Sequence, residues 1–248
     1  NIFISKITYQ TIKKLFFIIF SLDRNLIRAF LNDIPAGTEH LKFFKNIKKI
    51  NTIVDIGSHK GQFAIISKFV YKNVKIFSFD PLKSSKKKYK SILKKKDGYH
   101  FFHCAIGSKN TYSKINISRS SDSSSILDFS KKLTSIYSHA EKIAEEKITI
   151  TKLSNCIKKR DLKQPSLLKL DVQGYEIEAL KGCENLLKFF NFIYIECSFI
   201  ELYKNQPLYS DIKRWLKLRN FTYVKKFNSS FDKHNNIIQA DFFFKNSR

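Results

Sequence analysis

The sequence predicts an α/β fold built on a mostly parallel β-sheet. From residue 52 onward, short runs of β-branched and aromatic residues alternate with helical patterns, which is typical of βαβ units. The first run leads through a glycine turn, Gly57 to Gly61, directly into a helical pattern. A short polar segment joins the last two runs, which predicts an antiparallel hairpin. We therefore expect a seven-stranded sheet with helices on both faces.

The individual elements follow from run length and periodicity. Short apolar runs between glycine-containing or polar segments predict strands, and longer stretches with apolar residues three and four positions apart predict helices. The expected strands of the main sheet are residues 52–56, 75–79, 99–105, 166–170, 192–198, 221–227 and 237–244. The expected helices are residues 61–70, 84–95, 176–188 and 209–218.

The segment between residues 107 and 147 is less regular. It contains a strand-like run at residues 115–118, a serine-rich loop at residues 120–125 and a helical pattern near residues 133–147. Residues 148–152 alternate apolar and polar side chains, as an edge strand does. We expect a single large α/β domain, residues 51–248, that contains all of these elements.

Residues 1–50 are expected to form an N-terminal helical extension. The apolar run at residues 15–20 is too short for a membrane-spanning helix, which needs about 20 apolar residues. No small-residue cleavage site follows it, which argues against a signal peptide. We expect an amphipathic helix that packs on the domain, with peripheral contact with a membrane surface as the alternative.

The formal net charge of +25 raises the question of a nucleic-acid partner. Only seven of the 46 basic residues are Arg, however, and phosphate and base recognition favours Arg. The basic residues are spread along the whole chain, and the densest run, residues 83–96, reads most simply as a solvated helix face. We therefore expect no nucleic-acid partner.

The four cysteines, at positions 104, 156, 183 and 197, have neither CxxC spacing nor a His at metal-ligand spacing. We therefore expect no disulfide framework and no metal site. We expect a reducing, cytoplasmic location, with peripheral attachment at the inner face of the membrane as the alternative. The chain contains no Met and begins with Asn, so we expect it to be a piece of a longer protein.

A ligand site is expected at the first strand-to-helix turn, which runs from Asp55 through Gly57, Ser58 and Gly61 to Gln62. The glycines let the backbone turn sharply and approach a ligand closely. Asp55 stands at the carboxyl end of the strand, where ligands bind in open α/β sheets. The spacing Gly-x-x-x-Gly lacks the pyrophosphate-cradling pattern of dinucleotide folds. An acid before the glycines suits a positively charged ligand group instead.

A second acid, Asp80, ends the second strand 19 residues after Gly61. An acid near this spacing accepts hydrogen bonds from ribose hydroxyls. Pro81 ends the strand directly after it. Each feature alone also fits an ordinary strand-to-helix turn, but the two together at this spacing predict a ribose-binding pocket.

Two later strands also end in acids. Asp171 follows the apolar strand at residues 166–170, and Glu196 interrupts the strand at residues 192–198 near its carboxyl end. Because buried carboxylates are costly unless they are paired or functional, both are candidates for the reactive centre. The structural alternatives are that Asp171 and Glu176 cap the following helix and that Glu196 pairs with a Lys.

These segments resemble the FkbM-type methyltransferases from about residue 50 to about residue 225. The matching motifs are Asp55-Ile56-Gly57-x-x-x-Gly61-Gln62, Phe79-Asp80-Pro81, Ala105-Ile106-Gly107, and Lys169-Leu170-Asp171-Val172-Gln173-Gly174-Tyr175-Glu176 followed by Leu180 and Gly182. The last block is the most specific, since the glycine turn alone fits many class I methyltransferases. The expected fold is therefore the Rossmann-like fold of that class.

The resemblance implies S-adenosylmethionine as cofactor and methylation of a hydroxyl on a sugar, a polysaccharide or a secondary metabolite. Asp55, Gly57 and Gly61 would surround the methionine part, and Asp80 would hold the ribose. Asp171 would lie near the point of methyl transfer. The whole cofactor-binding set expected by position is Asp55, Gly57, Ser58, Gly61, Gln62, Asp80, Pro81, Ala105, Ile106 and Asp171, with Ala105 and Ile106 beside the adenine.

Two positions depart from many relatives, which carry Glu where this chain has Asp80 and Gln173. Asp80 shortens the reach to the ribose by one methylene and keeps the chemistry, and Gln173 is a common exchange. Residues 1–50 lie outside the resemblance, so they could carry specificity for a substrate or a membrane.

A sugar hydroxyl is a poor nucleophile, and a carboxylate or His within hydrogen-bond reach could remove its proton during attack. Asp171 is the first candidate for this general base because it lies at the centre of the crevice, and Glu196 is the second. Glu176, His59 and His103 are further candidates.

Two other classes of function stay open. An RNA 2′-O-methyltransferase would explain the charge, although the chain has no [Asn/Asp]-Pro-Pro-[Tyr/Phe] motif for amino methylation of a flipped base. The other class is a non-catalytic glycan-cluster or membrane-associated protein that keeps a degenerate methyltransferase fold.

Overall fold

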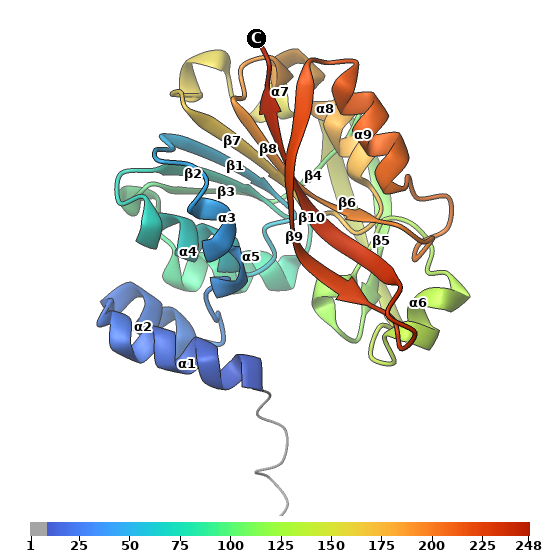
Figure 1. Ribbon diagram of the computed structural model, residues 1–248, viewed down its shortest axis with the longest axis horizontal. Coiled ribbons are helices and arrows are strands. Elements are labelled where there is room, and N and C mark those ends of the chain that lie inside the picture. The colour runs from blue at the N-terminus through green and yellow to red at the C-terminus, as the bar shows by residue number, and fades with distance from the viewer. Residues whose placement is uncertain (1–8) are drawn as a thin grey trace, which may run out of the picture.

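The computed structural model describes residues 9–248, which form a seven-stranded main sheet in the order β3-β2-β1-β7-β8-β10-β9 (Figure 1). The strands are β1 (Thr52–Ile56), β2 (Lys75–Phe79), β3 (Tyr99–Phe102), β7 (Ser166–Leu170), β8 (Phe192–Ser198), β9 (Phe221–Phe231) and β10 (Ile237–Asn246). β10 is antiparallel to both of its neighbours, and the remaining pairs are parallel. The predicted mostly parallel sheet of the class I type, with its C-terminal antiparallel hairpin, is confirmed.

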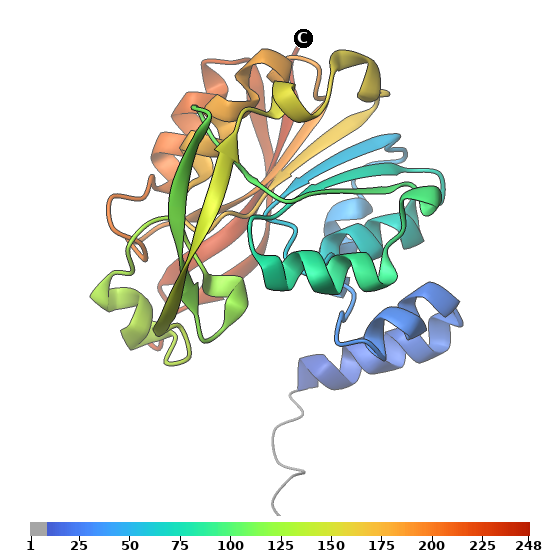
Figure 2. The same ribbon diagram turned by 180° about the vertical axis from the view of Figure 1, so that it is seen from behind.

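Helices cover both faces of this sheet, as predicted (Figures 1 and 2). One face carries α3 (Leu41–Phe44), α4 (Gln62–Val70) and α5 (Lys83–Ile92), and the other carries α7 (Leu153–Cys156), α8 (Glu176–Leu187) and α9 (Tyr209–Lys217). Side chains alternate along β1. Ile53 therefore packs in the core on the face of α3, α4 and α5, and Val54 and Ile56 pack in the core on the face of α7, α8 and α9. The carboxyl ends of β1, β2 and β7 are left free to build a site.

The N-terminal segment packs against the first face. Its elements are α1 (Tyr9–Ser21), α2 (Arg24–Phe30), the short 3₁₀ helix η1 (Thr38–His40) and α3. Asp23 caps α2 by accepting hydrogen bonds from the Asn25 and Leu26 amides. Phe43 stacks on Tyr194 of β8 with ring centroids 3.9 Å apart. No helix within residues 9–248 has the length and apolar character needed to cross a membrane.

The strand predicted at residues 99–105 is wrong in its second half. β3 ends at Phe102, and the chain then leaves the main sheet at His103. Ala105 and Ile106 form β4, which pairs with β6 (Lys142–Thr151) in a separate three-stranded sheet of order β4-β6-β5. Only His103 separates Phe102 from the apolar residues that follow, and a single polar residue does not mark a change of sheet.

The helix predicted near residues 133–147 is also wrong. Only α6 (Lys131–Ile136) is helical, and Lys142 begins β6. The residues of this segment favour helix, but pairing along β5 (Thr111–Ser118) overrides that local preference. The predicted edge strand at residues 148–152 is instead the end of β6, which is the central strand of the small sheet.

Other bounds differ by a few residues, as element ends usually do. The second predicted helix ends at Ile92 because Leu93 is extended, and β9 and β10 are each longer than predicted. All four cysteines are free. No group of three or more potential metal ligands gathers in the part of the chain that the structure describes.

Candidate functional site

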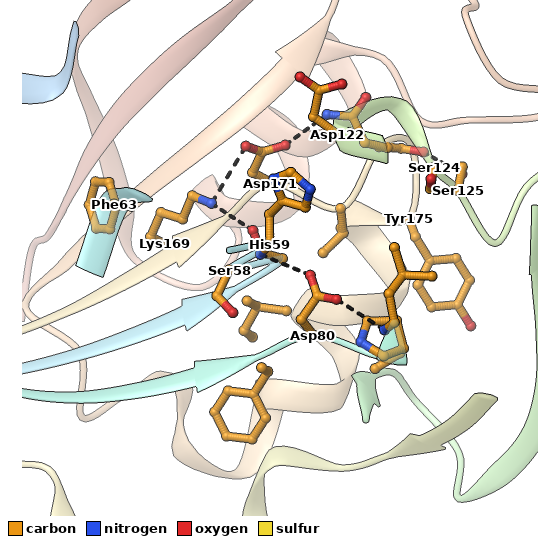
Figure 3. A pocket seen from close by; sticks show the side chains of 18 of the residues that line it. Ser58, His59, Phe63, Asp80, Asp122, Ser124, Ser125, Lys169, Asp171 and Tyr175 are labelled. Atoms are coloured by element: carbon orange, nitrogen blue, oxygen red, sulfur yellow. Dashed lines mark hydrogen bonds and ion pairs between the residues drawn. The ribbon is translucent and has the colours of Figure 1, made fainter. Parts of the chain in front are cut away.

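A cavity of about 240 Å³ opens at the carboxyl ends of β1, β2 and β7 (Figure 3). Its wall also includes β4, the serine-rich segment and His40 of the N-terminal segment. Eight of the residues predicted from the sequence line it: Gly57, Ser58, Gln62, Asp80, Pro81, Ala105, Ile106 and Asp171. Asp55, Gly61 and Glu196 do not.

Gly57 makes the sharp turn at the end of β1. Its φ of 77° lies in the left-handed region, and a Cβ there would stand 1.7 Å from the carbonyl oxygen of Asp171. Its amide donates to the Phe79 carbonyl at 2.9 Å, as does that of Ser58 at 3.1 Å. The turn therefore has no room for a side chain, and it joins the ends of three strands at the cavity.

Gly61 has a different role from the one predicted by position. It is the N-cap of α4 with φ 98°. A Cβ on it would meet Leu93 at 2.6 Å and Tyr89 at 3.0 Å. The glycine thus allows α4 to pack closely against α5 and lies outside the cavity wall.

Asp80 stands at the end of β2 and points into the cavity (Figure 3). Its Oδ2 accepts a hydrogen bond from the His59 amide at 2.9 Å, and its Oδ1 accepts one from the Leu82 amide at 3.0 Å. Burial raises the pKa of this carboxyl to about 6, against the backbone donors that favour the ionised form. The carboxylate is therefore fixed in place by two loops and keeps lone pairs for a ligand.

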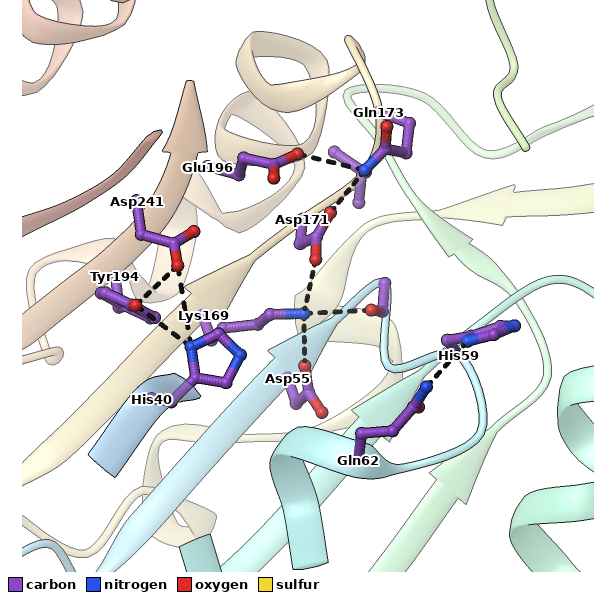
Figure 4. A network of polar contacts seen from close by, with 12 residues as sticks. His40, Asp55, His59, Gln62, Lys169, Asp171, Gln173, Tyr194, Glu196 and Asp241 are labelled. Atoms are coloured by element: carbon purple, nitrogen blue, oxygen red, sulfur yellow. Dashed lines mark hydrogen bonds and ion pairs between the residues drawn. The ribbon is translucent and has the colours of Figure 1, made fainter. Parts of the chain in front are cut away.

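Lys169, near the carboxyl end of β7, is a buried cation that was not among the predicted site residues. It lies opposite Asp55 in the parallel pairing of β1 and β7. Its Nζ is 3.2 Å from Asp55 Oδ1 and 3.5 Å from Asp171 Oδ2, and it donates to the Gly57 carbonyl at 3.1 Å (Figure 4). Burial alone would lower its pKa, but the two carboxylates raise it above its usual range, so the amine is charged.

Asp55 is accordingly placed behind the cavity, beneath Lys169. Its side chain is fully buried, and neither carboxylate oxygen has a hydrogen-bond partner among the residues that the structure describes. The ion pair with Lys169 is what compensates its charge. Asp55 thus acts on the cavity through Lys169.

Asp171 connects the cavity to a second carboxyl. Its side chain is 35% exposed, and its Oδ1 accepts from the Gln173 amide nitrogen at 2.8 Å. The same nitrogen donates to Glu196 Oε2 at 3.1 Å (Figure 4). Burial first, and then Asp171, raise the pKa of Glu196 well above its usual range. Glu196 therefore reaches the site through Gln173, with Asp171 in front of it.

Two further predicted candidates take other positions. Glu176 is buried, and its Oε1 accepts from the amides of Gly174 at 3.0 Å and Val172 at 3.4 Å, which holds the loop after β7. His59 lines the cavity with its Nε2 2.8 Å from the Ser121 hydroxyl, and burial lowers its pKa. Glu176 is thus a loop-holding residue, and His59 ties the glycine turn to the serine-rich segment.

A polar cluster at one side of the cavity also escaped the sequence analysis. His40 lines the cavity and contacts Tyr194 of β8, while Asp241 of β10 lies behind both (Figure 4). Asp241 and Lys169 each interrupt an apolar strand, and that signal could have identified them. His40 lies in a segment without such a pattern, so only the fold reveals it.

A comparison with models of protein families identifies the family of this chain. Residues 55–224 match the family model described as the methyltransferase FkbM domain. A comparison with curated protein sequences finds no match.

Similar solved structures share little sequence with this chain. TehB from Haemophilus influenzae is 9% identical with a TM-score of 0.45 over 86% of this chain, which spans 63% of that one. Magnesium protoporphyrin IX methyltransferase from Synechocystis, with bound S-adenosylmethionine, is 10% identical with a TM-score of 0.45 over 98% of this chain and 99% of that one. The 1,6-didemethyltoxoflavin-N1-methyltransferase of Burkholderia thailandensis is 7% identical with a TM-score of 0.45 over 97% and 89%.

Proposed function

The chain belongs to the FkbM methyltransferase family, and on that premise we propose that it transfers a methyl group from S-adenosylmethionine to a hydroxyl of a sugar, a polysaccharide or a secondary metabolite. The family accounts for the methyl transfer and the cofactor. The hydroxyl acceptor is our proposal, and the chemistry of the cavity supports it.

The residues of the cavity suit S-adenosylmethionine. Asp80 offers acceptor oxygens for ribose hydroxyls at the end of β2. The buried Ser58 hydroxyl has no hydrogen-bond partner within residues 9–248, as expected of a polar atom that meets a ligand. Ala105 and Ile106 supply a small apolar surface for the adenine. Asp122 and Asp171 also line the cavity and favour a cationic ligand, so the cofactor is expected to lie between β1, β2 and β4.

When bound, the cofactor supplies an electrophilic methyl group for in-line displacement by a nucleophile. The protein contributes mainly by holding the acceptor oxygen in line, and such positioning is worth up to roughly 7–11 kcal/mol in favourable cases. Gly57 and Lys169 line the cavity in which the two reactants would be held, and the tight turn and the buried ion pair keep both residues in place.

The observation that carries the hydroxyl proposal is the placement of Asp171. Its partly exposed carboxylate faces the cavity, while Lys169 and Gln173 hold it from behind. A carboxylate can only accept hydrogen bonds. In this position it can therefore orient a substrate whose methyl-accepting group donates a hydrogen bond, as a hydroxyl does. Glu196, the second sequence candidate, contacts Asp171 only through Gln173 and is assigned to support it.

The replacement Asp171→Asn tests this proposal. It keeps the shape of the side chain and removes its charge. Because Asp171 holds the acceptor hydroxyl in place, we expect methyl transfer to fall by about 10²-fold, the loss typical of a misplaced reactant, with a much smaller fall in the affinity for S-adenosylhomocysteine. Calorimetry gives the affinity, and radiolabelled methyl transfer to a panel of glycosides gives the rate. A variant that transfers methyl groups at the wild-type rate contradicts the assignment of Asp171.

The two other classes of function are separated by the same preparation. A degenerate, non-catalytic protein would bind no S-adenosylhomocysteine or would bind it without turnover. An RNA 2′-O-methyltransferase would bind RNA with an affinity that falls steeply as salt rises, because it neutralises phosphates. The glycan proposal predicts turnover with a hydroxyl-bearing glycoside and no such salt-dependent RNA binding.

A further inference from the structure

Four segments far apart in sequence bring a polar cluster to the side of the cavity (Figure 4). His40 ends η1 of the N-terminal segment, Tyr194 lies in β8, Asn228 in β9 and Asp241 in β10. His40 Nδ1 is 3.1 Å from the Tyr194 hydroxyl and 3.6 Å from Asp241 Oδ2. The Asn228 amide nitrogen is 2.7 Å from Asp241 Oδ2 and 3.1 Å from the Tyr194 hydroxyl. Buried polar groups of this kind need a reason, since apolar residues would pack there at less cost.

The directions of these hydrogen bonds fix the imidazole tautomer. The Tyr194 hydroxyl donates its single proton to the Asp241 carboxylate at 2.7 Å. The two lone pairs of its oxygen can accept from the Asn228 amide and from His40 Nδ1, each at 3.1 Å. The Asn228 amide nitrogen also lies 3.4 Å from Nδ1, but its two hydrogens are taken up by the closer Asp241 and Tyr194 oxygens, so Nδ1 is left to donate. With the proton on Nδ1, the lone pair of the neutral ring lies on Nε2. The chain His40–Tyr194–Asp241 therefore leaves a basic nitrogen at the far edge of the ring.

This nitrogen, Nε2, belongs to the imidazole of His40, which lines the cavity. His40 Nε2 has no hydrogen-bond partner among residues 9–248, and the side chain is 15% exposed. The ring packs edge-on against Phe63 and Tyr194, with centroids 5.0 and 5.6 Å apart. A Cβ on Gly37 would stand 2.9 Å from the ring, so that glycine leaves room for it. The imidazole is thus held in one orientation before any ligand binds.

We propose that His40 Nε2 is the general base of methyl transfer, positioned by Tyr194 and Asp241. This inference rests on the proposed function. The hydroxyl oxygen forms a bond to the methyl carbon, the carbon–sulfur bond breaks with its electron pair staying on sulfur, and the hydroxyl proton passes to Nε2. The positive charge of the sulfonium is replaced by that of the imidazolium, and Asp241 lies close enough to stabilise it.

Asp171 and His40 then have distinct tasks. Both oxygens of Asp171 already have partners, Gln173 on one and Lys169 on the other, so this carboxylate holds the hydroxyl without needing to take its proton. His40 contributes the nitrogen that has no partner among the described residues. The N-terminal segment, which lies outside the family match, would in this way supply a catalytic residue.

Three variants test the proposal. His40→Gln should lower kcat about 10²- to 10⁴-fold, as expected for loss of a general base, with KM for S-adenosylmethionine within about twofold of wild type. Tyr194→Phe keeps the stacked ring, removes the hydroxyl and should show a smaller loss of kcat. His234→Gln is the matched control, because His234 is exposed at the β9–β10 turn, and it should behave as wild type.

A readout that needs no turnover completes the test. In the cofactor-free protein, ¹⁵N chemical shifts of the His40 ring should show a protonated Nδ1 and an unprotonated Nε2, and Tyr194→Phe should remove that preference. Calorimetry with S-adenosylhomocysteine reports whether each variant is folded and binds.

The outcomes separate the two proposals. A His40→Gln variant that binds S-adenosylhomocysteine and keeps the wild-type kcat, or a His40 ring protonated on Nε2, overturns the role of His40 and leaves the proposed function standing. A wild-type protein that transfers no methyl group to any hydroxyl fails the proposed function itself. Loss of kcat in His40→Gln with binding intact, together with a wild-type His40 ring that is protonated on Nδ1, supports the general base.

Discussion

At the scale of single residues, the site depends on charges that the β-sheet register places together. Lys169 and Asp55 face each other because β1 and β7 pair in parallel at that register. Their side chains are only 6% and 0% exposed, so each would be costly without the other. The pair stands directly beneath Asp171, which makes the stability of the core and the electrostatics of the cavity interdependent.

Replacing one member of this pair should destabilise the protein strongly. Lys169→Met leaves the buried Asp55 without its cation, and we expect the free energy of unfolding to fall by about 3–5 kcal/mol. Urea unfolding followed by circular dichroism measures the change. The double variant Asp55→Asn/Lys169→Met should recover most of the loss, and a double variant no more stable than the single one would contradict the pairing.

The cofactor affinity should depend on the protonation of Asp80. Burial raises the pKa of this carboxyl from 3.8 to about 6, and the ionised form is the stronger hydrogen-bond acceptor for ribose hydroxyls. The affinity for S-adenosylhomocysteine, measured by calorimetry, should therefore fall as the pH drops through about 6, and Asp80→Asn should bind weakly without that dependence. An affinity that stays constant between about pH 5 and about pH 7 would contradict this role of Asp80.

The same shift has a consequence for stability with the opposite sign. Between pH 3.8 and about 6, the folded protein holds a proton on Asp80 that the unfolded chain has released. The contribution of Asp80 to the free energy of unfolding therefore decreases as the pH rises through this window. A binding loss toward acid pH and a stability gain in the same direction are thus expected from one side chain.

Prediction from sequence succeeds for residues at strand ends. Asp80 and Asp171 could be assigned to a site because parallel strands bring their carboxyl ends to one edge. Asp55 was placed at the correct end of β1, but its side chain is buried against Lys169 and does not line the cavity. Strand periodicity alone does not reveal such a partner on a neighbouring strand. His40 depends on contacts across four segments, which no local pattern encodes.

At the scale of elements, the position of α8 is set by a single small residue. Gly182 packs against the backbone of Gly107 beside β4, where an added Cβ would stand 2.5 Å from the Gly107 carbonyl oxygen. A glycine within a helix normally costs about 1 kcal/mol relative to alanine. Here it allows the helix to approach the second sheet, which carries Ala105 and Ile106 into the cavity wall.

Gly182→Ala should therefore destabilise the protein, against the usual preference of helices for alanine. We expect a loss of more than about 1 kcal/mol in thermal or urea unfolding, typical of an overpacked contact. Asn185→Ala, on the exposed side of the same helix, is the control and should be neutral or slightly stabilising. Equal or greater stability of Gly182→Ala would show that α8 has room to move.

Element prediction succeeds where an apolar run is buried and flanked by clear turns. β1, β2, β7 and β8 have the bounds predicted from the sequence because each is a short apolar run in the middle of the sheet. The segment at residues 133–147 fails because its Lys, Glu and Ala favour helix locally, whereas pairing with β5 decides its structure. Long-range pairing of this kind is not written in a local pattern.

At the scale of the whole molecule, exposed apolar side chains gather on the N-terminal helices. Phe16, Ile19, Phe20, Leu22 and Leu31 are each more than half exposed. Figures 1 and 2 show α1 and α2 projecting from the end of the molecule opposite to the C-terminus. With a net charge of +25, this face suits an anionic surface better than a second copy of the chain. Peripheral membrane contact stays a prediction.

Sedimentation with lipid vesicles tests that prediction. Vesicles rich in phosphatidylglycerol should bind the protein, neutral phosphatidylcholine vesicles should not, and Phe16→Ser/Phe20→Ser should lower the bound fraction at least several-fold. Leu218→Ser is the matched control, because Leu218 is 76% exposed at the end of α9. Equal binding by the two variants would assign any attraction to charge alone.

The most direct test of the proposed function identifies the atom that receives the methyl group. The protein is incubated with S-adenosylmethionine labelled with ¹³C in the methyl group and a mixture of glycosides, polysaccharide fragments and RNA, and the products are examined by ¹³C NMR. We predict a labelled methyl on a sugar oxygen, formed by the wild-type protein and nearly abolished in Asp171→Asn. A labelled methyl on nitrogen, carbon or sulfur, or labelled ribose 2′-oxygens in RNA with no labelled glycoside, would contradict it.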